Sequence, residues 1–538
     1  MPSSLLRTDL ATCARYSQGG GIYRLIPAAV ARPDTIAAVG LTLAKAREQG
    51  LSVTPRGAGS AMDGSNVSTG LVLDLTDLDR GRCWINPDRR RASLSPSMSA
   101  AKLNQAAAAY GLRLPVDPSS GGWATLGGMI STNASGPRSV RSGSLRRWIQ
   151  GVDLETCDGP LKLRRGVQPD GAHPVVVRWR AEVEPLLRRH ASTIQARYPA
   201  VRKNSAGYAL DRYLEHGDLI EVVIGSEGTL GVITDVLVEL EPVPRHRGSL
   251  RVAVRDRADL VTCIETIRTF SPATLEFLDR SFLRLVANQD LTPERPGLLA
   301  EAAGLLLADF EGDVAADIAA DAAGAAAAVR AGALDVRIAM DRDEVDRLWA
   351  VRHGASPALA GLTDGRRSLQ VIEDGCVPVE RLADYLDAVE AAAAAERIDA
   401  VMFGHAGDGH VHVNLLPDLR DPDWRERVGR VFAAVSDVVI RLGGTPSGEH
   451  GAGRLRAGLL GLLYGPDVVE CFRAVKRAFD PSALFNPGVI LNDGSDPLSA
   501  LKVGWDAAQL PAGTEEYLLA VERDARWGES RWDVQIER

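Results

Sequence analysis

From Gly248 onward the chain repeats one order of expected strands and helices, and this order restricts the fold more than any other feature of the sequence. Strand-like and helix-like runs follow one another as β-α-β-β-α-β over residues 248–340, with an alanine-rich helix expected over 313–332. A similar order recurs over 369–449. The order is typical of the ferredoxin-like split β-α-β unit. We therefore expect two such units, which can join in one large antiparallel sheet.

The preceding part of the chain has a different pattern. Helix-period apolar spacing predicts a helix over 34–50 behind Asp34 as N-cap, and LVLDL at 71–75 indicates a buried strand. A long alternating strand begins at Val232 and closes a first domain near Pro242. A chain of 538 residues exceeds what one hydrophobic core usually supports. We expect at least two domains, with a boundary near residues 245 and 246.

Composition excludes several classes of protein. Apolar residues make up 45% and charged residues 25%, as in globular proteins, and a net charge of -8 without basic runs argues against a nucleic-acid partner. No run approaches the ~20 apolar residues of a spanning helix, and no apolar leader is visible. The six cysteines are far apart and form no CxxC pair, which argues against an iron–sulfur cluster. We expect a cytoplasmic protein, either free or peripheral to the inner membrane.

Two glycine-rich segments interrupt the first domain. RGAGS at 56–60 offers adjacent backbone N–H groups of the kind that hold a pyrophosphate, although a simple tight turn is the better explanation when such a loop stands alone. The second segment, over 114–144, is too poor in periodicity for a helix and too rich in small residues for a packed strand. Together the two segments indicate backbone that lies against a ligand.

Histidines concentrate in the second half of the chain. HVHVNLL at 410–416 alternates strictly, so a strand would direct His410, His412 and Asn414 to one face. The turn GHAGDGH can bring His405 to that face, and Glu449 and His450 end a later expected strand. Two imidazoles and a carboxylate form a sound divalent-metal site, whereas an isolated histidine is more often a structural residue. The clustering of these histidines favours a metal site over isolated structural residues.

Six segments carry a resemblance to the FAD-linked oxidase family. They are PRGAGS, PVDPSSGGWATLGGMISTNASG, GSEGTLGVITDVLVEL, GHAGDGHVHVNL, SGEHGAG and FNPGVI, and they occur in order over roughly residues 20–490. The resemblance is to the vanillyl-alcohol oxidase/p-cresol methylhydroxylase superfamily, in its branch of glycolate oxidase flavin subunits, D-lactate dehydrogenases and D-2-hydroxyglutarate dehydrogenases. It implies an α+β fold with a two-part FAD-binding domain of the p-cresol methylhydroxylase type over 20–245. A ferredoxin-like substrate cap over 246–480 and a return to the flavin over 481–490 would follow, and residues 491–538 form a tail without an assigned role.

The resemblance also implies which residues hold FAD. The expected flavin-binding residues are Arg56, Gly57, Ala58, Gly59, Ser60, Pro115, Asp117, Ser119, Thr125, Gly128, Ser131, Asn133, Ser135, Glu227, Gly228, Gly231, Ile233 and Asn486. Relatives that attach FAD through a histidine place it near the first glycine loop. Residues 54–64 contain no histidine, so we expect FAD to be bound non-covalently.

The chemistry implied is the oxidation of a D-2-hydroxy acid to the 2-oxo acid, with hydride transfer to flavin N5. The resemblance assigns a divalent metal, expected to be zinc, to the side chains of His405, His412 and Glu449. It places Asn414 nearby and makes His450 the general base. Arg352 is the expected anchor of the substrate carboxylate, the alternative being a surface arginine on a helix.

One departure from the pattern of the D-2-hydroxyglutarate enzymes narrows the range of expected substrates. In those enzymes a lysine holds the second carboxylate of the substrate. The matching stretch, SLQVIEDGCVP at 368–378, contains no lysine, which favours a monocarboxylate such as D-lactate. Arg366 or Arg367 could still serve a dicarboxylate. The electrons would leave through a separate iron–sulfur protein, quinone or cytochrome. A homodimer is a possible oligomeric state. Two alternative functions stay open: a metal-independent flavin oxidase of another alcohol, and a non-catalytic electron-transfer subunit.

Overall fold

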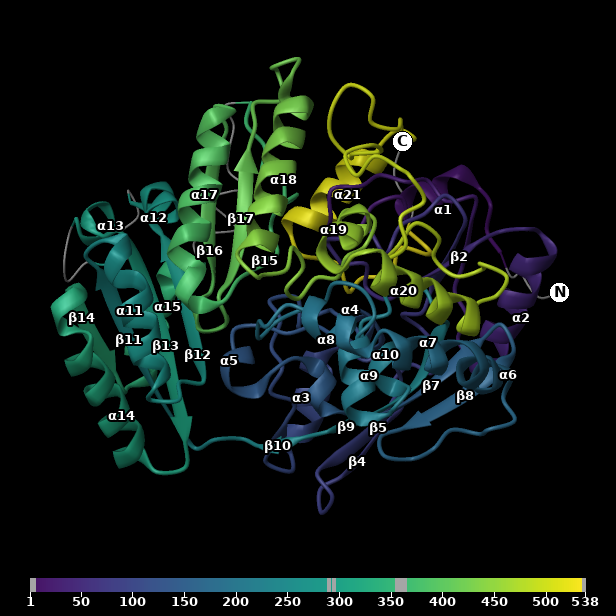
Figure 1. Cartoon of the computed structure of the whole chain (residues 1–538), viewed down its shortest axis with the longest axis horizontal. Helices are drawn as coiled ribbons and strands as arrows, with labels where there is room; N and C mark the ends of the chain where they lie inside the picture. Colours follow the sequence, from purple (N-terminus) through teal and green to yellow (C-terminus); the bar gives the residue numbers. More distant parts are fainter. Residues whose placement is uncertain (1–5, 288–291, 293–296, 354–364, 535–538) are drawn as a thin grey trace.

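The computed structural model describes residues 6–287, 292, 297–353 and 365–534, which form two sheet-based parts that lie side by side (Figure 1). The N-terminal part begins with a parallel sheet in the order β1-β3-β2, formed by β1 (Ala29–Ala31), β2 (Val53–Arg56) and β3 (Leu71–Asp74). The connecting helix α2 (Ile36–Glu48) starts behind Thr35, whose side chain accepts a hydrogen bond from the Ala38 amide. Thr35 is therefore the N-cap, and the expectation for Asp34 was wrong by one residue.

A second sheet of the N-terminal part is antiparallel and has the order β4-β5-β9-β7-β8. Its strands are β4 (Cys83–Asn86), β5 (Arg91–Leu94), β7 (Ile149–Thr156), β8 (Gly159–Arg164) and β9 (Val232–Glu239). From Thr234 to Glu239, β9 alternates buried and half-buried residues, as the sequence pattern predicts for a strand with one face on the core. The short strands β6 (Leu112–Arg113) and β10 (Glu241–Pro242) pair separately.

Helices complete the N-terminal part. They are α1 (Leu10–Arg15), α3 (Ala100–Ala108), α4 (Leu126–Thr132), α5 (Ser139–Ser142), α6 (Pro174–Arg178), α7 (Glu184–Arg189), α8 (Ala191–Arg197), α9 (Leu210–His216) and α10 (Ile220–Val223). α4 and α5 lie in the segment 114–144, for which no helix was expected. The Thr125 side chain caps α4 by accepting a hydrogen bond from the Gly128 amide, so a local cap offsets the poor helix propensity of the glycines.

The second part is one seven-stranded sheet with the order β14-β11-β13-β12-β16-β17-β15. Its strands are β11 (His246–Val254), β12 (Thr274–Asp279), β13 (Gly304–Gly312), β14 (Ala333–Ala339), β15 (Gly375–Cys376), β16 (Asp399–His405) and β17 (His410–Leu416). The paired strands are antiparallel, so the two expected units do join in one sheet.

Both faces of this sheet are covered, because neighbouring residues of a strand contribute to different cores. In β11, Val252 and Val254 belong to the core under α11 (Arg257–Arg268), α14 (Ala315–Ala328), α17 (Leu382–Ala395) and α18 (Trp424–Arg441). Ala253 belongs to the opposite core, under α12 (Arg280–Val286), α13 (Leu298–Glu301) and α15 (Arg342–His353).

The second unit is less regular than the sequence pattern predicts. Strands were expected at 368–374 and 445–450, but β15 has two residues and the segment 445–450 is a loop. The carboxylate of Asp374 explains the loop: it accepts hydrogen bonds from the Ser447 hydroxyl and from the Glu449 and His450 amides. Side-chain hydrogen bonds thus replace a strand ladder.

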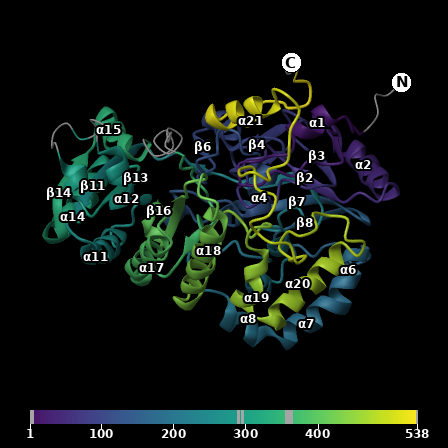
Figure 2. The ribbon, with the colours of Figure 1, turned by 90° about the horizontal axis from the view of Figure 1, so that it is seen from above.

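The chain then returns to the N-terminal part. α19 (Leu460–Tyr464) and α20 (Pro466–Phe479) pack into the same core as α6 and α8, so the return begins before residue 481 (Figure 2). Beyond it, the tail with α21 (Thr514–Arg523) covers α1, and Arg15 donates hydrogen bonds to the carbonyls of Arg531 and Trp532. No helix of the described residues has both the length and the apolar character that crossing a membrane requires.

Candidate active site

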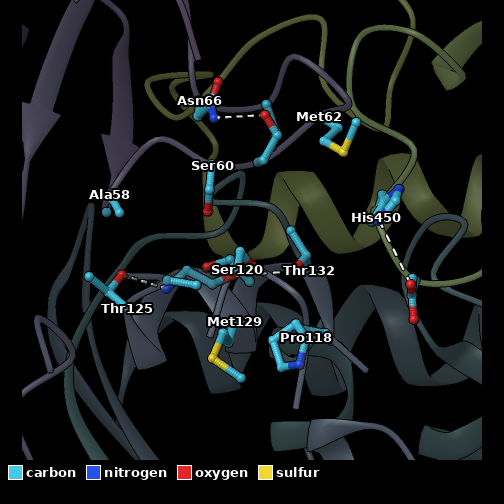
Figure 3. A pocket seen from close by; sticks show the side chains of 18 of the residues that line it. Ala58, Ser60, Met62, Asn66, Pro118, Ser120, Thr125, Met129, Thr132 and His450 are labelled. Carbon is cyan, nitrogen blue, oxygen red and sulfur yellow. Dashed lines mark hydrogen bonds and ion pairs between the residues drawn. The ribbon is translucent and has the colours of Figure 1, made fainter. Parts of the chain in front are cut away.

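A cavity of about 320 Å³ lies where the two parts of the chain meet. The N-terminal part contributes β2 and the loop after it, α4 and its flanks, and the segment that leads into β9. The second part contributes Arg352 of α15, side chains of β16 and β17, and Glu449 and His450. Figure 3 shows Ala58 and Thr125 at one end of this cavity and His450 at the other. The glycine loops and the histidine cluster therefore line a single cavity.

The two glycine-rich segments touch each other along the cavity wall. A Cβ atom on Gly57 of the first segment would lie 2.1 Å from the Thr125 hydroxyl oxygen of the second, and one on Gly136 would lie 2.5 Å from the Asp117 carbonyl oxygen within the second segment. A side chain at Gly57 would force the two segments apart, and one at Gly136 would distort the second. The glycines therefore permit close approach, and they leave main chain of the kind that can bind phosphate groups along the cavity wall.

Most of the residues expected to bind FAD, metal or substrate line this cavity; the exceptions are Pro115, Asp117, Asn133 and Asn486. Asp117 binds Arg138, with 2.5 Å between Oδ2 and Nη1. Asn133 has a positive φ of 51° and ends α4, and its side chain accepts a hydrogen bond from the Arg146 amide. The Asn486 amide donates to the carbonyls of Ser65 and Glu227, each at 2.8 Å. These side chains hold the cavity-lining segments in place from behind.

Arg56 is also directed away from the cavity. Its guanidinium is buried and donates to the carbonyl oxygens of Tyr16, Asn66 and Gln18. Burial without a bound carboxylate lowers the pKa of Arg56 to about 9. Arg56 thus uses its side chain to hold the N-terminal segment in place.

The histidine cluster is built on the β16–β17 hairpin. His405 ends β16 and pairs in register with His410, and the alternation of β17 buries Val411 and Val413 on the opposite face. The Nε2 atom of His412 lies 3.3 Å from Nε2 of His405. Glu449 Oε1 lies 3.1 Å from Nε2 of His405 and 3.5 Å from Nε2 of His412. Three predicted metal ligands are thus brought together.

The other oxygen of Glu449 is fixed from outside the cluster. Oε2 accepts hydrogen bonds from the Lys203 ammonium at 2.7 Å and from the Ser135 hydroxyl at 2.6 Å. Burial alone would raise the pKa of Glu449, but the charge of Lys203 and the neighbouring imidazoles hold it well below its ordinary value. The carboxylate is therefore ionised, with Oε1 directed at the histidines.

Each imidazole of the predicted metal set is anchored through Nδ1. Nδ1 of His405 binds the buried carboxylate of Glu276, and Nδ1 of His412 lies 3.0 Å from the Glu373 carbonyl. Anchoring of one ring nitrogen fixes the tautomer and directs the other nitrogen to a metal. Burial and the neighbouring rings lower the pKa of His412 well below its ordinary value, so this ring is neutral and its Nε2 carries a lone pair.

His450 stands beside the cluster and is oriented by a different carboxylate. Its Nδ1 lies 2.7 Å from Oε2 of Glu373, whose other oxygen binds the buried Arg456. Burial favours the neutral ring, but Glu373 and Asp374 raise the pKa of His450 to about 10. A divalent cation at the cluster would act in the opposite direction, because its charge disfavours a protonated imidazole nearby.

Arg352 lines the cavity from the end of α15. Its Nε donates to Oε2 of Glu276 at 3.1 Å, and its guanidinium lies 4.7 Å from the ring centroid of Phe403. Glu276 therefore links the expected carboxylate anchor to a metal ligand, His405. Arg366 donates to Asp399 at 2.6 Å, and neither Arg366 nor Arg367 is among the lining residues. Residues 354–364, which follow the Arg352 segment, lie outside the described part of the chain.

Sequence reasoning missed Glu276 and Lys203 and gave Glu373 no role in the site. A charged residue inside the apolar run of β12 was a signal for Glu276, since burial of a carboxylate requires a partner. Lys203 lies in an irregular segment, and no pattern marks it.

The residues present fit both groups that the motifs imply. The Nε2 atoms of His405 and His412 converge with an ionised carboxylate oxygen, which is a ligand set for a divalent cation such as zinc. Burial alone would lower the pKa of His405, but Glu276 and Glu449 raise it to about 9, and a bound cation would replace that ring's Nε2 proton. The cavity wall of glycine-rich main chain fits the phosphates of FAD, and the cavity runs from there to His450.

Two family models match the chain. The FAD binding domain model matches residues 27–163, and the model of FAD linked oxidases, C-terminal domain, matches residues 243–490. The chain belongs to the FAD-linked oxidase family. It is an FAD-linked oxidoreductase, and the α+β fold with a p-cresol methylhydroxylase-type FAD domain and a large antiparallel sheet is confirmed.

Curated relatives of this chain include enzymes of the predicted branch of glycolate oxidase flavin subunits, D-lactate dehydrogenases and D-2-hydroxyglutarate dehydrogenases. Glycolate oxidase subunit GlcD of Bacillus subtilis is 29% identical over 471 residues, covering 87% of this chain and 89% of the relative. D-lactate dehydrogenase of Archaeoglobus fulgidus is 29% identical over 468 residues, covering 86% of this chain and 91% of the relative. D-2-hydroxyglutarate dehydrogenase of Escherichia coli is 28% identical over 95% of this chain, which spans 53% of that relative.

A solved structure of alkyldihydroxyacetonephosphate synthase has the same fold. Its TM-score is 0.64 at 16% identity, with 90% of this chain and 83% of that chain covered.

Proposed function

We propose that this member of the FAD-linked oxidase family is a dehydrogenase that oxidises a small D-2-hydroxy acid to the corresponding 2-oxo acid. One observation carries the proposal: His450, held by Glu373, stands beside the cluster of His405, His412 and Glu449 in the same cavity that the FAD-binding segments line. The matched relatives named for glycolate, D-lactate and D-2-hydroxyglutarate support the choice of substrate class.

The roles of the chain's own residues follow from their positions. His450 takes the substrate hydroxyl proton through Nε2, because Nδ1 is engaged by Glu373. Arg352 binds the substrate carboxylate, and Glu276 keeps its guanidinium in place. Asn414 lines the cavity with its carbonyl oxygen bound by Ser368 at 2.9 Å. When bound, FAD accepts the hydride from the substrate Cα–H and a divalent metal, which we propose to be zinc, polarises the hydroxyl group.

We propose a monocarboxylate such as D-lactate as the substrate. Among the described residues that line the cavity there is no lysine, and Arg56 is committed to backbone carbonyls. Arg352 is then the one arginine in that lining with its side chain beside the histidine cluster, which suffices for one carboxylate.

The reduced flavin must pass its electrons to a separate acceptor, which we propose to be an iron–sulfur protein, a quinone or a cytochrome. We place the enzyme in the cytoplasm, free or at the inner membrane.

Steady-state turnover with an artificial electron-accepting dye tests the proposal. We expect one short D-2-hydroxy acid to give the highest kcat/KM, its L-enantiomer to be far slower, and the 2-oxo acid to accumulate in equal amount to the dye reduced. Peroxide release in air at the same rate would instead identify an oxidase.

A further inference from the structure

His410 has one ring nitrogen without a hydrogen-bond partner among the described residues. The side chain is fully buried at 0% exposure, and the atom concerned is Nδ1. The other nitrogen, Nε2, lies 2.9 Å from Oδ1 of Asp374. A buried polar atom without a partner destabilises the folded state, so its retention requires an explanation.

The hydrogen bonds of Asp374 determine which nitrogen of His410 carries the proton. Asp374 accepts from the Ser447 hydroxyl at 3.0 Å, from the Glu449 amide at 3.1 Å and from the His450 amide at 3.0 Å. A carboxylate that accepts from three donors is also the acceptor for Nε2–H of His410. Nδ1 therefore bears a lone pair and needs a donor or a cation.

That lone pair faces the metal-ligand cluster. Nδ1 of His410 lies 3.8 Å from Oε1 of Glu449, too far for a hydrogen bond. The ligand atoms of His405, His410, His412 and Glu449 all lie within 4.8 Å of one another. Two ligand atoms that each lie ~2.1 Å from a zinc ion in a tetrahedron are about 3.4 Å apart. The separations of 3.1, 3.5 and 3.8 Å between Glu449 Oε1 and the nitrogens of His405, His412 and His410 are close to that value, which suits one shared ion.

We propose that His410, through Nδ1, is a fourth protein ligand of the divalent metal that the proposed function places at His405, His412 and Glu449. Asp374 is its positioning residue, in the same relation that Glu276 has to His405. The ligand set then has three imidazoles and one carboxylate, which favours zinc or another transition metal over magnesium or calcium.

A fourth protein ligand would also change how the substrate reaches the metal. Four protein ligands complete a tetrahedral set, so the substrate hydroxyl would enter as an additional ligand rather than fill a vacant fourth position. His410 thereby restricts how many substrate oxygens reach the metal.

Metal binding by the full-length, FAD-loaded protein tests this assignment without an activity measurement. The stripped protein is titrated with Zn²⁺ against a chromophoric chelator, and with Co²⁺ while its visible absorption is recorded. The variants are His410→Gln, His412→Gln as a ligand-loss reference, and His216→Gln as a control at an exposed histidine. We expect His410→Gln to weaken Zn²⁺ binding at least about 10-fold and to change the Co²⁺ bands, with FAD content and apo-protein melting unchanged.

X-ray absorption of the zinc-loaded wild type gives an answer that does not depend on folding of a variant. Three imidazoles at bonding distance support the proposal, and two overturn it. Unchanged Zn²⁺ affinity in a folded His410→Gln protein also overturns it, while leaving the proposed function intact. Failure of the wild type to bind any divalent metal would overturn both this inference and the metal-assisted part of the proposed function.

Discussion

Oε2 of Glu373 lies 2.7 Å from Nδ1 of His450, and this contact leaves Nε2 as the ring nitrogen that is available to the cavity. The second oxygen of Glu373 binds Arg456, which is itself fully buried, so the carboxylate has little freedom. Glu373 also accepts from Nδ1 of His412 through its backbone carbonyl, at 3.0 Å. One residue thus orients both the proposed base and a proposed metal ligand.

Replacement of Glu373 by glutamine should slow flavin reduction by roughly 10–100-fold while FAD stays bound. The amide keeps the size of the side chain but removes the charge that aligns His450, so part of the general-base contribution is lost. Stopped-flow absorbance at saturating substrate measures the rate. A rate equal to that of the wild type would show that the contact does not assist the chemistry.

Alanine variants at two histidines should separate the base from the metal. His450→Ala is expected to keep both FAD and metal and to lose about 10²–10⁴-fold in flavin reduction. His405→Ala should lose the metal as well, because its Nε2 is one of the converging atoms. Metal content by elemental analysis and single-turnover rates distinguish the two. Normal turnover in both variants would contradict the mechanism.

Glu276→Gln should weaken metal binding by about 10–100-fold, because the anchor of His405 is altered. KM for the hydroxy acid should rise at the same time, since Arg352 loses the charged partner of its Nε. Chelator competition and initial rates measure the two effects.

Glu221→Gln is the matched control for Glu276→Gln. Like Glu276, Glu221 is a buried glutamate, but its partners are Arg146 and Arg165, whereas those of Glu276 are the predicted metal ligand His405 and Arg352. Equal loss of metal affinity in both variants would show that the effect of Glu276 is a general loss of stability.

Glu311→Gln should destabilise the junction between the two parts of the chain. Glu311 of β13 binds Arg113 at 2.7 Å and Arg138 at 3.0 Å, both from the N-terminal part. Burial alone would raise its pKa, but hydrogen bonds and charge from the two arginines lower the pKa of Glu311 to about 2. The carboxylate therefore contributes stability above its unfolded pKa, and the contribution is lost as the pH falls through 4.5 toward 2.

The expected loss in the variant is on the order of 2–3 kcal/mol at pH 7, because a pKa shift of one unit corresponds to about 1.4 kcal/mol and Arg138 is partly exposed. Thermal unfolding of both proteins at pH 7 and near pH 3.5 measures it. The deficit should shrink at the lower pH; a deficit that grows there would contradict the assigned sign.

The histidine cluster was predictable from sequence only in part. The alternation of β17 correctly placed His410, His412 and Asn414 on one face, because Val411 and Val413 have to be buried. The segment 445–450 was expected to be a strand, and it is a loop because its polar atoms bind Asp374. A periodicity argument counts apolar residues and does not see such long-range hydrogen bonds.

The supporting residues were less predictable. Lys203 and Ser135 reach Glu449 from positions 246 and 314 residues away in sequence, and only the packing of the two parts brings them together. The joining of the two units in one sheet, in contrast, follows from local patterns of strands and helices, which is why one continuous sheet could be anticipated although two of its expected strands were not found as predicted.

The most direct test of the central claim is anaerobic reduction of the flavin by a panel of D- and L-2-hydroxy acids, with the metal-loaded protein, the chelator-treated protein and the protein reloaded with zinc. The account predicts rapid bleaching of the flavin absorbance by a short D-2-hydroxy acid, loss of that bleaching after chelation and its recovery with zinc. Bleaching that is unaffected by chelation, or none with any hydroxy acid, would contradict it.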